Sequence, residues 1–387
     1  MYKKSMINLL VSLAVGLGIA FSSAVWAKNP EMAVKNRDSN GDGKVSLDEW
    51  DKKEFIFNKI DLDGDGYLTV KEFAIKWGVP VPGESPQEIA DNTGVDTGSP
   101  TTDLMPIADL HFHPGSNVSS SPAEIIGLMN DTGVKWAGSG SGGGKGSSFR
   151  LWQQYAEQMD GRFIPFAGQK DFLVAYFKGG TSAMLDPYNR IISKFMRQLE
   201  SDLEAGRAKG VGELFINNMN TNKNPKMRRK VAADAPIFQD LYQLLAKHNA
   251  FLGIHMEGDS DSLEQMENLL SSDRNGRILW NHCGSTTSSS DVRRMMSRNS
   301  NLFCEFSFRY MHTKSERNIF GASWLDGGWR ELIEDFPDRF MIGTDAHNSN
   351  DYRKYVKVVR SGLLANLSDE TAEKVAYKNA QYLFGLQ

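Results

Sequence analysis

Alternation between short apolar runs and amphipathic runs is the feature that most limits how this chain of 387 residues can fold. Over residues 106–387, apolar runs of strand length recur between segments of helical spacing, which is the pattern of parallel strands joined by helices. Eight such runs in about this length predict an α/β fold, the (β/α)8 TIM barrel. The predicted strands are Ile107–His111, Val134–Gly138, Phe163–Ala167, Gly210–Ile216, Phe251–His255, Ile278–His282, Leu302–Phe306 and Phe340–Gly343. A doubly wound open sheet is the alternative, but no GxGxxG turn follows the first strand.

Helices are predicted between these strands from apolar spacing, caps and prolines. Ser121 and Pro122 open the first of them. A long helix is expected over Pro187–Ala205, with Asp186 as its N-cap and Pro187 at the first helical position. The remaining predicted helices are Pro236–Lys247, Ser262–Leu270, Asp291–Met296, Trp329–Asp335, Asp351–Leu364 and Ser368–Tyr382.

Histidines and carboxylates gather at the C-terminal ends of the predicted strands, where a TIM barrel builds its active site. In His111-Phe112-His113, the strand period of two places both imidazoles on one side. The complete set is His111, His113, Glu213, His255, His282 and Asp345. Four imidazoles and two carboxylates form a nitrogen and oxygen donor set, which predicts a site for zinc or manganese, with one or two ions.

The order and spacing of these residues resemble the amidohydrolase superfamily, over essentially all of residues 106–387. The resemblance implies two metal positions. The more buried metal would be bound by His111, His113 and Asp345, and the second by His255 and His282, with Glu213 bridging them. Such a bridging glutamate is similar to the arrangement in TatD-like deoxyribonucleases.

A second resemblance bears on the number of metals. The segment from Met341 to Ala346 is similar to the amidohydrolase-related branch, in which one metal is often enough. In that case Glu213 lies beside the ligands rather than among them, and His282 contacts the substrate. The choice between one metal and two stays open at this point.

The expected chemistry follows from the charges in this site. A metal lowers the pKa of bound water to about 7, which gives hydroxide at neutral pH. Asp345 would take the proton of that water and pass it to the leaving group, and His282 would help to polarise the oxygen under attack. The expected function is hydrolysis of an ester, lactone, amide or phosphoester bond in a small molecule. A metal-dependent decarboxylase of the amidohydrolase-related branch and a non-catalytic calcium-dependent binding protein are the alternatives.

Basic side chains near the expected barrel mouth are candidates for substrate binding. The loop after the fourth strand holds five bases, among them Arg228 and Arg229, while Arg309 and His347 follow the seventh and eighth strands. Because residues 106–387 are otherwise nearly neutral, this basic loop favours an anionic substrate. A solvated surface run is the alternative.

Two loops ahead of the barrel fit the twelve-residue EF-hand pattern, with oxygen ligands at alternate positions, a glycine at position 6 and a closing glutamate. The first loop offers Asp38, Asn40, Asp42, Lys44 (through its carbonyl) and Glu49, and the second offers Asp61, Asp63, Asp65, Tyr67 (through its carbonyl) and Glu72. The segment resembles the compact EF-hand pairs of exported bacterial proteins. We therefore expect a small all-α unit that binds two Ca²⁺ ions, and a structural role for this calcium. Val45 and Leu68 are expected to pair the two loops.

Four segments are predicted: a signal peptide (1–27), the EF-hand pair (28–79), a linker (80–105) and the barrel (106–387). Lys3 and Lys4, followed by an apolar run over 7–21 and small residues at the cleavage position, are typical of a secretory signal, so a periplasmic or secreted protein is expected. An uncleaved anchor is the alternative, and no membrane span is expected after cleavage.

The charge and the cysteine content limit which other classes of protein the chain can belong to. The formal net charge is −4, and the acidity lies in the N-terminal part, so no basic face predicts nucleic-acid binding. Cys283 and Cys304 are expected to be free thiols. The sequence does not indicate an oligomeric state.

Overall fold

The computed structural model describes residues 29–57, 60–61, 65–77, 104–113, 121–139, 155–222, 224–310, 318–346 and 348–387. The chain divides into two compact units, Met1–Gly98 and Ser99–Gln387. The predicted signal peptide and most of the predicted linker lie outside the described residues. Within the described part, no helix has both the length and the apolar character needed to cross a membrane.

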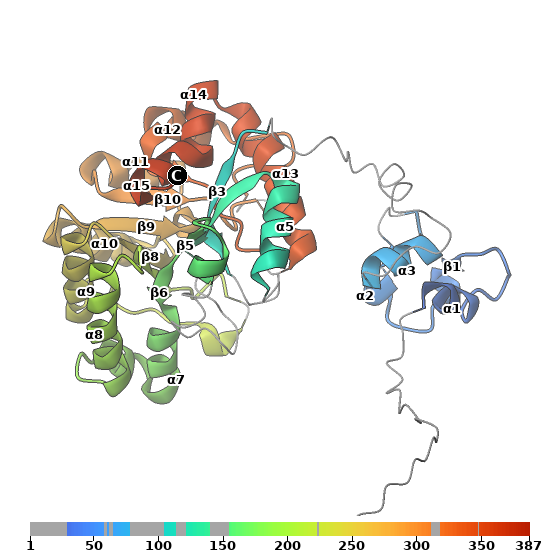
Figure 1. The fold of residues 1–387 in the computed structure, drawn as a ribbon, viewed down its shortest axis with the longest axis horizontal. Coiled ribbons are helices and arrows are strands. Elements are labelled where there is room, and N and C mark those ends of the chain that lie inside the picture. Colours follow the sequence, from blue (N-terminus) through green and yellow to red (C-terminus); the bar gives the residue numbers. More distant parts are fainter. Residues whose placement is uncertain are drawn as a thin grey trace, which may run out of the picture. The chain divides into compact units, whose positions relative to one another are not determined.

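The larger unit is a barrel of parallel strands, as the sequence predicts (Figure 1). Each of the eight predicted strand ranges contains a strand or, in one case, two. The strands are β3 (Ile107–Phe112), β4 (Val134–Ser139), β5 (Phe163–Ile164), β6 (Phe166–Gly168), β7 (Gly210–Asn217), β8 (Phe251–Met256), β9 (Arg277–Asn281), β10 (Leu302–Glu305) and β11 (Phe340–Met341). β5 and β6 lie on either side of Pro165, which has no N–H to donate, and together they fill one position of the barrel.

Parallel pairing runs from β3 through β4 to β5, and from β6 through β7, β8, β9 and β10 to β11. The barrel closes between the first and last strands, where Asp109 pairs in parallel with Ile342 and the Leu110 N–H donates to the Ile342 carbonyl at 2.8 Å. Closure brings the C-terminal ends of all strands to one rim, and every predicted metal ligand of the barrel lies at that rim.

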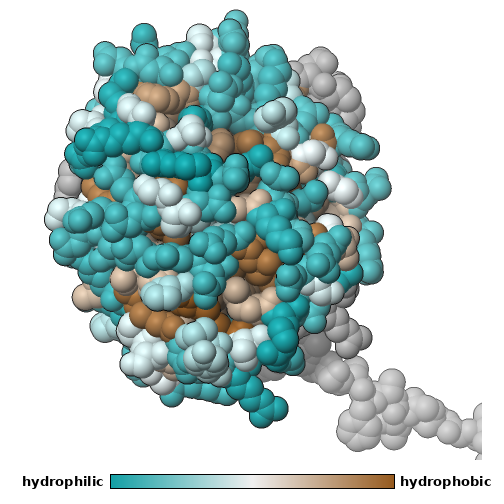
Figure 2. Space-filling view, turned by 90° about the vertical axis from the view of Figure 1, so that its left-hand side faces the viewer, coloured by the Kyte–Doolittle hydropathy of each residue, from teal (hydrophilic) through white to brown (hydrophobic). Residues whose placement is uncertain are grey.

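Helices lie outside the strands and cover their outer faces (Figure 1). They are α5 (Pro122–Thr132), α7 (Gln169–Leu185), α8 (Arg190–Glu204), α9 (Pro236–Lys247), α10 (Ser260–Ser272), α11 (Ser289–Arg298), α12 (Gly327–Asp335), α13 (Ser349–Val358), α14 (Asp369–Glu373) and α15 (Asn379–Phe384). Figure 2 faces the side on which α8, α9 and α10 lie, and shows hydrophilic residues over most of it with hydrophobic residues in smaller patches between them. These helices are therefore amphipathic, with their apolar sides packed on the strands.

The prediction for the segment after the third strand position was wrong in two respects. A helix, α7, was not predicted there: the glycine pair Gly179 and Gly180 interrupts its apolar pattern, and the structure has non-helical backbone angles at both residues. The next helix, α8, begins at Arg190 instead of Pro187. Asp186 accepts the Tyr188 N–H in a turn, and Asn189 caps the helix by accepting the Ile191 N–H at 2.9 Å.

The smaller unit contains the two EF-hand loops, between α1 (Pro30–Lys35), α2 (Glu54–Phe57) and α3 (Val70–Trp77). The predicted contact between the loops is confirmed: β1 (Val45–Ser46) and β2 (Tyr67–Leu68) are antiparallel, with Val45 opposite Leu68. Gly43 and Gly66 have φ of +85° and +84°, the left-handed turn that the pattern requires at position 6. Residues 62–64, including the predicted ligand Asp63, lie outside the described residues.

The closing carboxylate of the first loop reaches across it. Glu49 accepts hydrogen bonds from the backbone and side chain of Ser46 and from Ser39, and these bonds lower its pKa to about 2. Asp38 accepts the Gly41, Asp42 and Gly43 N–H groups. Hydrogen bonds within the loop therefore hold the carboxylates of Asp38 and Glu49, which are the first and the closing ligands of an EF-hand loop.

Replacing both closing glutamates (Glu49→Gln with Glu72→Gln) is expected to abolish calcium binding and to lower the stability of this unit. Calcium bound only to the folded unit stabilises it by about 2.7 kcal/mol at 100 times the Kd. Calorimetry with and without calcium checks this. A calcium-dependent shift that persists in the double variant would contradict the assignment.

Candidate metal centre

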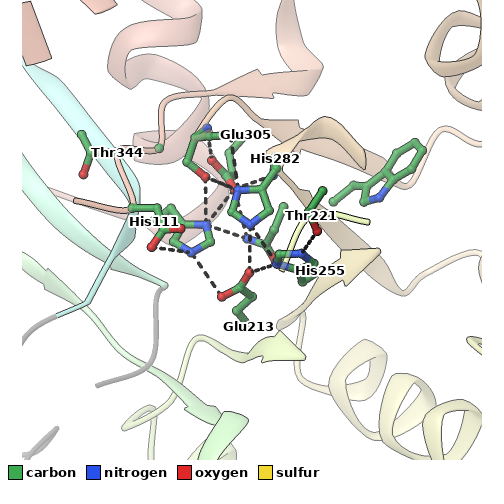
Figure 3. Close-up of polar contacts among 12 residues, drawn as sticks. His111, Glu213, Thr221, His255, His282, Glu305 and Thr344 are labelled. Carbon is green, nitrogen blue, oxygen red and sulfur yellow. Dashed lines mark hydrogen bonds and ion pairs between the residues drawn. The ribbon is translucent and has the colours of Figure 1, made fainter. Parts of the chain in front are cut away.

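The six side chains predicted as ligands come together at the C-terminal rim of the barrel. His111 lies on β3 and His113 just beyond it, Glu213 on β7, His255 on β8, His282 just after β9 and Asp345 after β11. All are buried except His255, which is partly exposed. Figure 3 shows Glu213 lying between His111 on one side and His255 and His282 on the other. The structure thus brings residues that are up to 234 positions apart in the chain into one cluster.

Four donor atoms form the first group. His111 Nε2 lies 3.0 Å from His113 Nε2, 3.4 Å from Glu213 Oε2 and 3.7 Å from Asp345 Oδ1. His113 Nε2 lies 3.0 Å from Asp345 Oδ1 and 3.8 Å from Glu213 Oε2. Ligands about 2.1 Å from a tetrahedral zinc ion are separated by about 3.4 Å from one another, so this donor set fits a divalent cation.

Three donor atoms form the second group. The other oxygen of Glu213, Oε1, lies 2.5 Å from His255 Nδ1 and 2.9 Å from His282 Nε2, and the two ring nitrogens are 2.9 Å apart. His255 therefore faces the centre with Nδ1, while its Nε2 lies 3.5 Å from the hydroxyl of Thr221. Glu213 is common to both groups, and each of its oxygens belongs to one of them.

The charges of this buried cluster are mutually dependent. Burial alone would lower the pKa of His111, but the neighbouring carboxylates of Asp345, Glu305 and Glu213 raise it well above its ordinary value. Burial also opposes ionisation of Glu213, yet the charges of His111 and His255 hold its pKa well below the usual range. Protons on imidazoles therefore balance the buried carboxylates, and a divalent cation can take over that role.

The backbone conformation sets the direction of two of the side chains in the cluster. His282 and Asp345 have φ of 58° and 47°, in the left-handed region that side-chain-bearing residues adopt rarely. Asp109 braces the second of these positions: its carboxylate accepts the His111 N–H at 3.0 Å and both the N–H and the hydroxyl of Thr344 at 2.9 and 2.6 Å. Burial raises the pKa of Asp109 to about 6. The hydrogen bonds tie the end of β3 to the segment that carries Asp345.

A family model described as amidohydrolase matches residues 173–386, which is more than half of the chain. The chain belongs to the amidohydrolase family. Together with the buried histidine and carboxylate cluster, this membership makes it a metal-dependent enzyme of that family. An EF-hand model matches residues 38–56 and 53–74. No curated protein matches the sequence.

Solved structures with a similar fold include an uncharacterised TIM-barrel protein from Bordetella bronchiseptica, at 14% identity and a TM-score of 0.49, covering 72% of this chain and 98% of that one. A probable 2-pyrone-4,6-dicarboxylic acid hydrolase from Acinetobacter baumannii is 13% identical, with a TM-score of 0.45, and covers 72% of this chain and 99% of that one. A 2,6-dihydroxybenzoate decarboxylase from Rhizobium is 12% identical, with a TM-score of 0.42, and covers 67% and 87%.

Two buried carboxylates beside this amidohydrolase centre, Asp109 and Glu305, were not predicted. Glu305 ends β10, is fully buried and lies 2.8 Å from His111 Nδ1. The available signal was a lone charged residue at the C-terminal end of an otherwise apolar predicted strand, Leu302–Phe306. The position is equivalent to that of the other site residues, but no second acidic or histidine residue nearby in sequence marks it.

The substrate-binding role predicted for Arg309 is not supported by its position. Its guanidinium is buried, donates to the carbonyls of Ser285 and Thr287, and lies 4.8 Å from the ring centre of Trp329. Burial lowers its pKa to about 10. Arg309 therefore holds the left-handed turn after β9, which begins at His282, rather than facing a ligand.

The basic loop after β7 is less available to an anion than its sequence suggests. Arg229 is buried, with its guanidinium 4.0 Å from the ring centre of Tyr176 and 5.6 Å from that of Phe215, whose ring contacts His255. Lys230 is paired with Asp259 at 2.7 Å. Arg228 is exposed and donates to a backbone carbonyl. Lys223 and the predicted substrate contact His347 lie outside the described residues.

Metal affinity is expected to rise with pH through the neutral range. Interactions with carboxylates raise the pKa values of His111 and His113 against the effect of burial, so these imidazoles hold protons that a metal must displace. Each displaced proton changes the apparent affinity by up to about tenfold per pH unit below the raised pKa, and the gain levels off above it. Competition with a chromophoric chelator between pH 6 and 8 measures this slope. An affinity independent of pH would contradict the assignment of these protons.

Proposed function

We propose that this protein is an exported hydrolase that uses a metal-activated water to cleave an ester, lactone, amide or phosphoester bond in a small molecule. The observation that carries the proposal is the placement of Glu213, with one oxygen 3.4 Å from His111 Nε2 and the other 2.5 Å from His255 Nδ1. A carboxylate shared between two groups of imidazoles suits a pair of zinc or manganese ions. Membership of the amidohydrolase family supports the same reading.

The residues of the cluster have separate roles in the proposed reaction. His111, His113 and Asp345 would hold one metal, and His255 and His282 the other, with Glu213 shared. A metal bound there lowers the pKa of a coordinated water to about 7 and polarises the oxygen of the bond under attack.

Asp345 is the proposed proton carrier. Burial opposes its ionisation, but His111 and His113 keep its pKa below the usual range, so it is a carboxylate at neutral pH. It therefore accepts the proton of the attacking water and delivers it to the leaving group. His282, whose Nε2 faces the same space, is the second candidate catalytic residue.

The proposed substrate class follows from the charge at the C-terminal rim of the barrel. Arg228 remains an exposed cation there, and an anionic small molecule is the proposed substrate. Export is proposed from the N-terminal sequence, in which Lys3 and Lys4 precede an apolar run. In a calcium-rich outer compartment, the EF-hand pair would stay loaded with two calcium ions and act structurally.

Elemental analysis of protein purified without chelator, followed by product analysis on a panel of esters, lactones, amides and phosphoesters, tests the proposal. Two transition-metal ions per chain and a hydrolysed product support it. One ion per chain would remove Glu213 and His282 from the ligand set. Release of CO₂ from carboxylated aromatic compounds, with no hydrolysis, would replace it with a lyase function. Absence of any transition metal would favour a non-catalytic protein.

A further inference from the structure

Glu305 lies on the Nδ1 side of His111, whereas Nε2 of that ring faces His113, Glu213 and Asp345. Its Oε1 atom lies 2.8 Å from His111 Nδ1, and it also accepts the His282 backbone N–H at 2.8 Å and the Ser307 hydroxyl at 2.8 Å. The second oxygen, Oε2, accepts the Ser307 backbone N–H at 2.7 Å. Figure 3 shows the carboxylate above His111 and His282, opposite Glu213.

These bonds make Glu305 an acceptor and not a metal ligand. A metal bound to Oε1 would have to displace the donors from His111, His282 and Ser307, all within 2.8 Å. It would also have to use His111 Nδ1, although His111 Nε2 already faces His113, Glu213 and Asp345. The carboxylate instead satisfies buried donors, which would be costly to leave unpaired.

The first consequence concerns His111. A neutral imidazole carries one N–H, and the nitrogen without it binds metal. Glu305 accepts at this contact, because each of its oxygens also accepts a backbone N–H, Oε1 from His282 and Oε2 from Ser307. The proton of His111 therefore lies on Nδ1, and the lone pair of Nε2 faces the metal centre.

The second consequence concerns His282, which Glu305 reaches through Ser307. The Ser307 hydroxyl donates its only proton to Glu305, so it can only accept at its contact of 2.7 Å with His282 Nδ1. The proton of His282 must then lie on Nδ1, which leaves the Nε2 lone pair facing Glu213 and His255. One carboxylate thus sets the orientation of two imidazoles, one in each donor group.

Gly343 provides the space for this arrangement. A Cβ atom at that position would lie 1.9 Å from Glu305 Oε2 and 2.8 Å from the Cβ of His111. The carboxylate is therefore packed between β11 and β3 with no room for another side chain beside it.

We propose that Glu305 is a positioning residue of the metal centre: it fixes the tautomers of His111 directly and of His282 through Ser307, so that both present Nε2 to the metal. The inference rests on the metal centre of the proposed function but not on the bond that is cleaved. Buried partners of this kind fix the tautomer and raise the basicity of a metal-binding histidine.

The test compares Glu305→Gln, Ser307→Ala and a control, Asp202→Asn, in the full-length protein loaded with zinc. Asp202 is a buried carboxylate of α8 that pairs with Arg207, and it contacts none of the metal-centre residues. Nitrogen NMR of ¹⁵N-histidine-labelled protein reports which ring nitrogen carries the proton, and competition with a chelator gives the zinc affinity. Neither measurement needs a substrate, so a failure of the proposed hydrolase activity would leave both results interpretable.

We expect Nδ1–H tautomers at His111 and His282 in the unmodified protein. Glu305→Gln should lower zinc affinity about 10- to 100-fold and alter both tautomers, because the amide nitrogen of glutamine would face hydrogen-bond donors. Ser307→Ala should alter His282 alone, with a smaller loss of affinity, and Asp202→Asn should change neither. Unaltered zinc affinity in Glu305→Gln would overturn the proposal. If that variant does not fold, an Nε2–H tautomer at either histidine of the unmodified protein would overturn it equally.

Discussion

Replacing Asp345 with asparagine is expected to lower kcat/KM by about 10²- to 10⁴-fold, the usual contribution of a positioned general base. Asparagine keeps the shape of the side chain and an oxygen to face His113 Nε2, which lies 3.0 Å from Asp345 Oδ1. It cannot accept a proton from water at neutral pH. Asparagine also tolerates the left-handed backbone, here at φ 47°, better than most residues, so the segment after β11 should keep its conformation. The loss should therefore fall on turnover rather than on folding.

Metal content must be measured on the same preparation, because Asp345 is also a proposed ligand. Asp338→Asn is the matched control: it makes the same chemical change at a side chain that is 69% exposed and paired with Lys374 on the surface. Asp338→Asn should retain full activity. An Asp345→Asn protein with normal metal content and full activity would exclude the general-base role. Loss of both metal and activity would assign Asp345 as a ligand, because the missing metal then accounts for the lost activity.

Most of the fold, and the cluster of side chains at the rim of the barrel, could be predicted from local sequence patterns. The strands of the barrel are buried on both faces, so they read as continuous apolar runs such as Phe251–His255, and the helices between them read as amphipathic. Once the strands are placed, the fold itself brings their C-terminal ends together. His111, Glu213 and Asp345 could therefore be grouped from sequence although they are far apart along the chain.

The features that could not be predicted from the sequence depend on backbone angles and on contacts between residues that are far apart in the chain. The kink at Gly179 and Gly180 hid α7, because a pair of glycines reads as a loop. Arg309 reads as a basic residue at a strand end, but the left-handed turn that starts at His282 supplies carbonyl groups that bind it. Glu305 has its decisive partner, His111, 194 residues away, and no motif within β10 points to it.

Removing the transition metal from the barrel is expected to reduce turnover more than about 10³-fold while leaving the fold intact. The proposed reaction depends on a water whose pKa the metal lowers from 15.7 to about 7, so the nucleophile is lost without it. The fold should survive because the buried carboxylates keep protonated imidazoles as partners. The pKa values of His111 and His113 are raised, since the effect of the neighbouring carboxylates outweighs the effect of burial. Far-ultraviolet circular dichroism and activity, measured before and after dialysis against a strong chelator, test both statements.

Because the chain offers two kinds of candidate metal site, the chelator result needs a control that separates them. Zinc or manganese should restore turnover, since imidazole nitrogens make up most of the barrel donor set, and calcium alone should not, because it prefers sites composed of oxygen. The double variant Glu49→Gln with Glu72→Gln removes the closing oxygens of both EF-hand loops and leaves the barrel unchanged. It should lose calcium and keep the turnover of the folded enzyme. If its turnover falls while its zinc content is normal, calcium regulates the barrel, and the structural role assigned to the EF-hand pair is wrong.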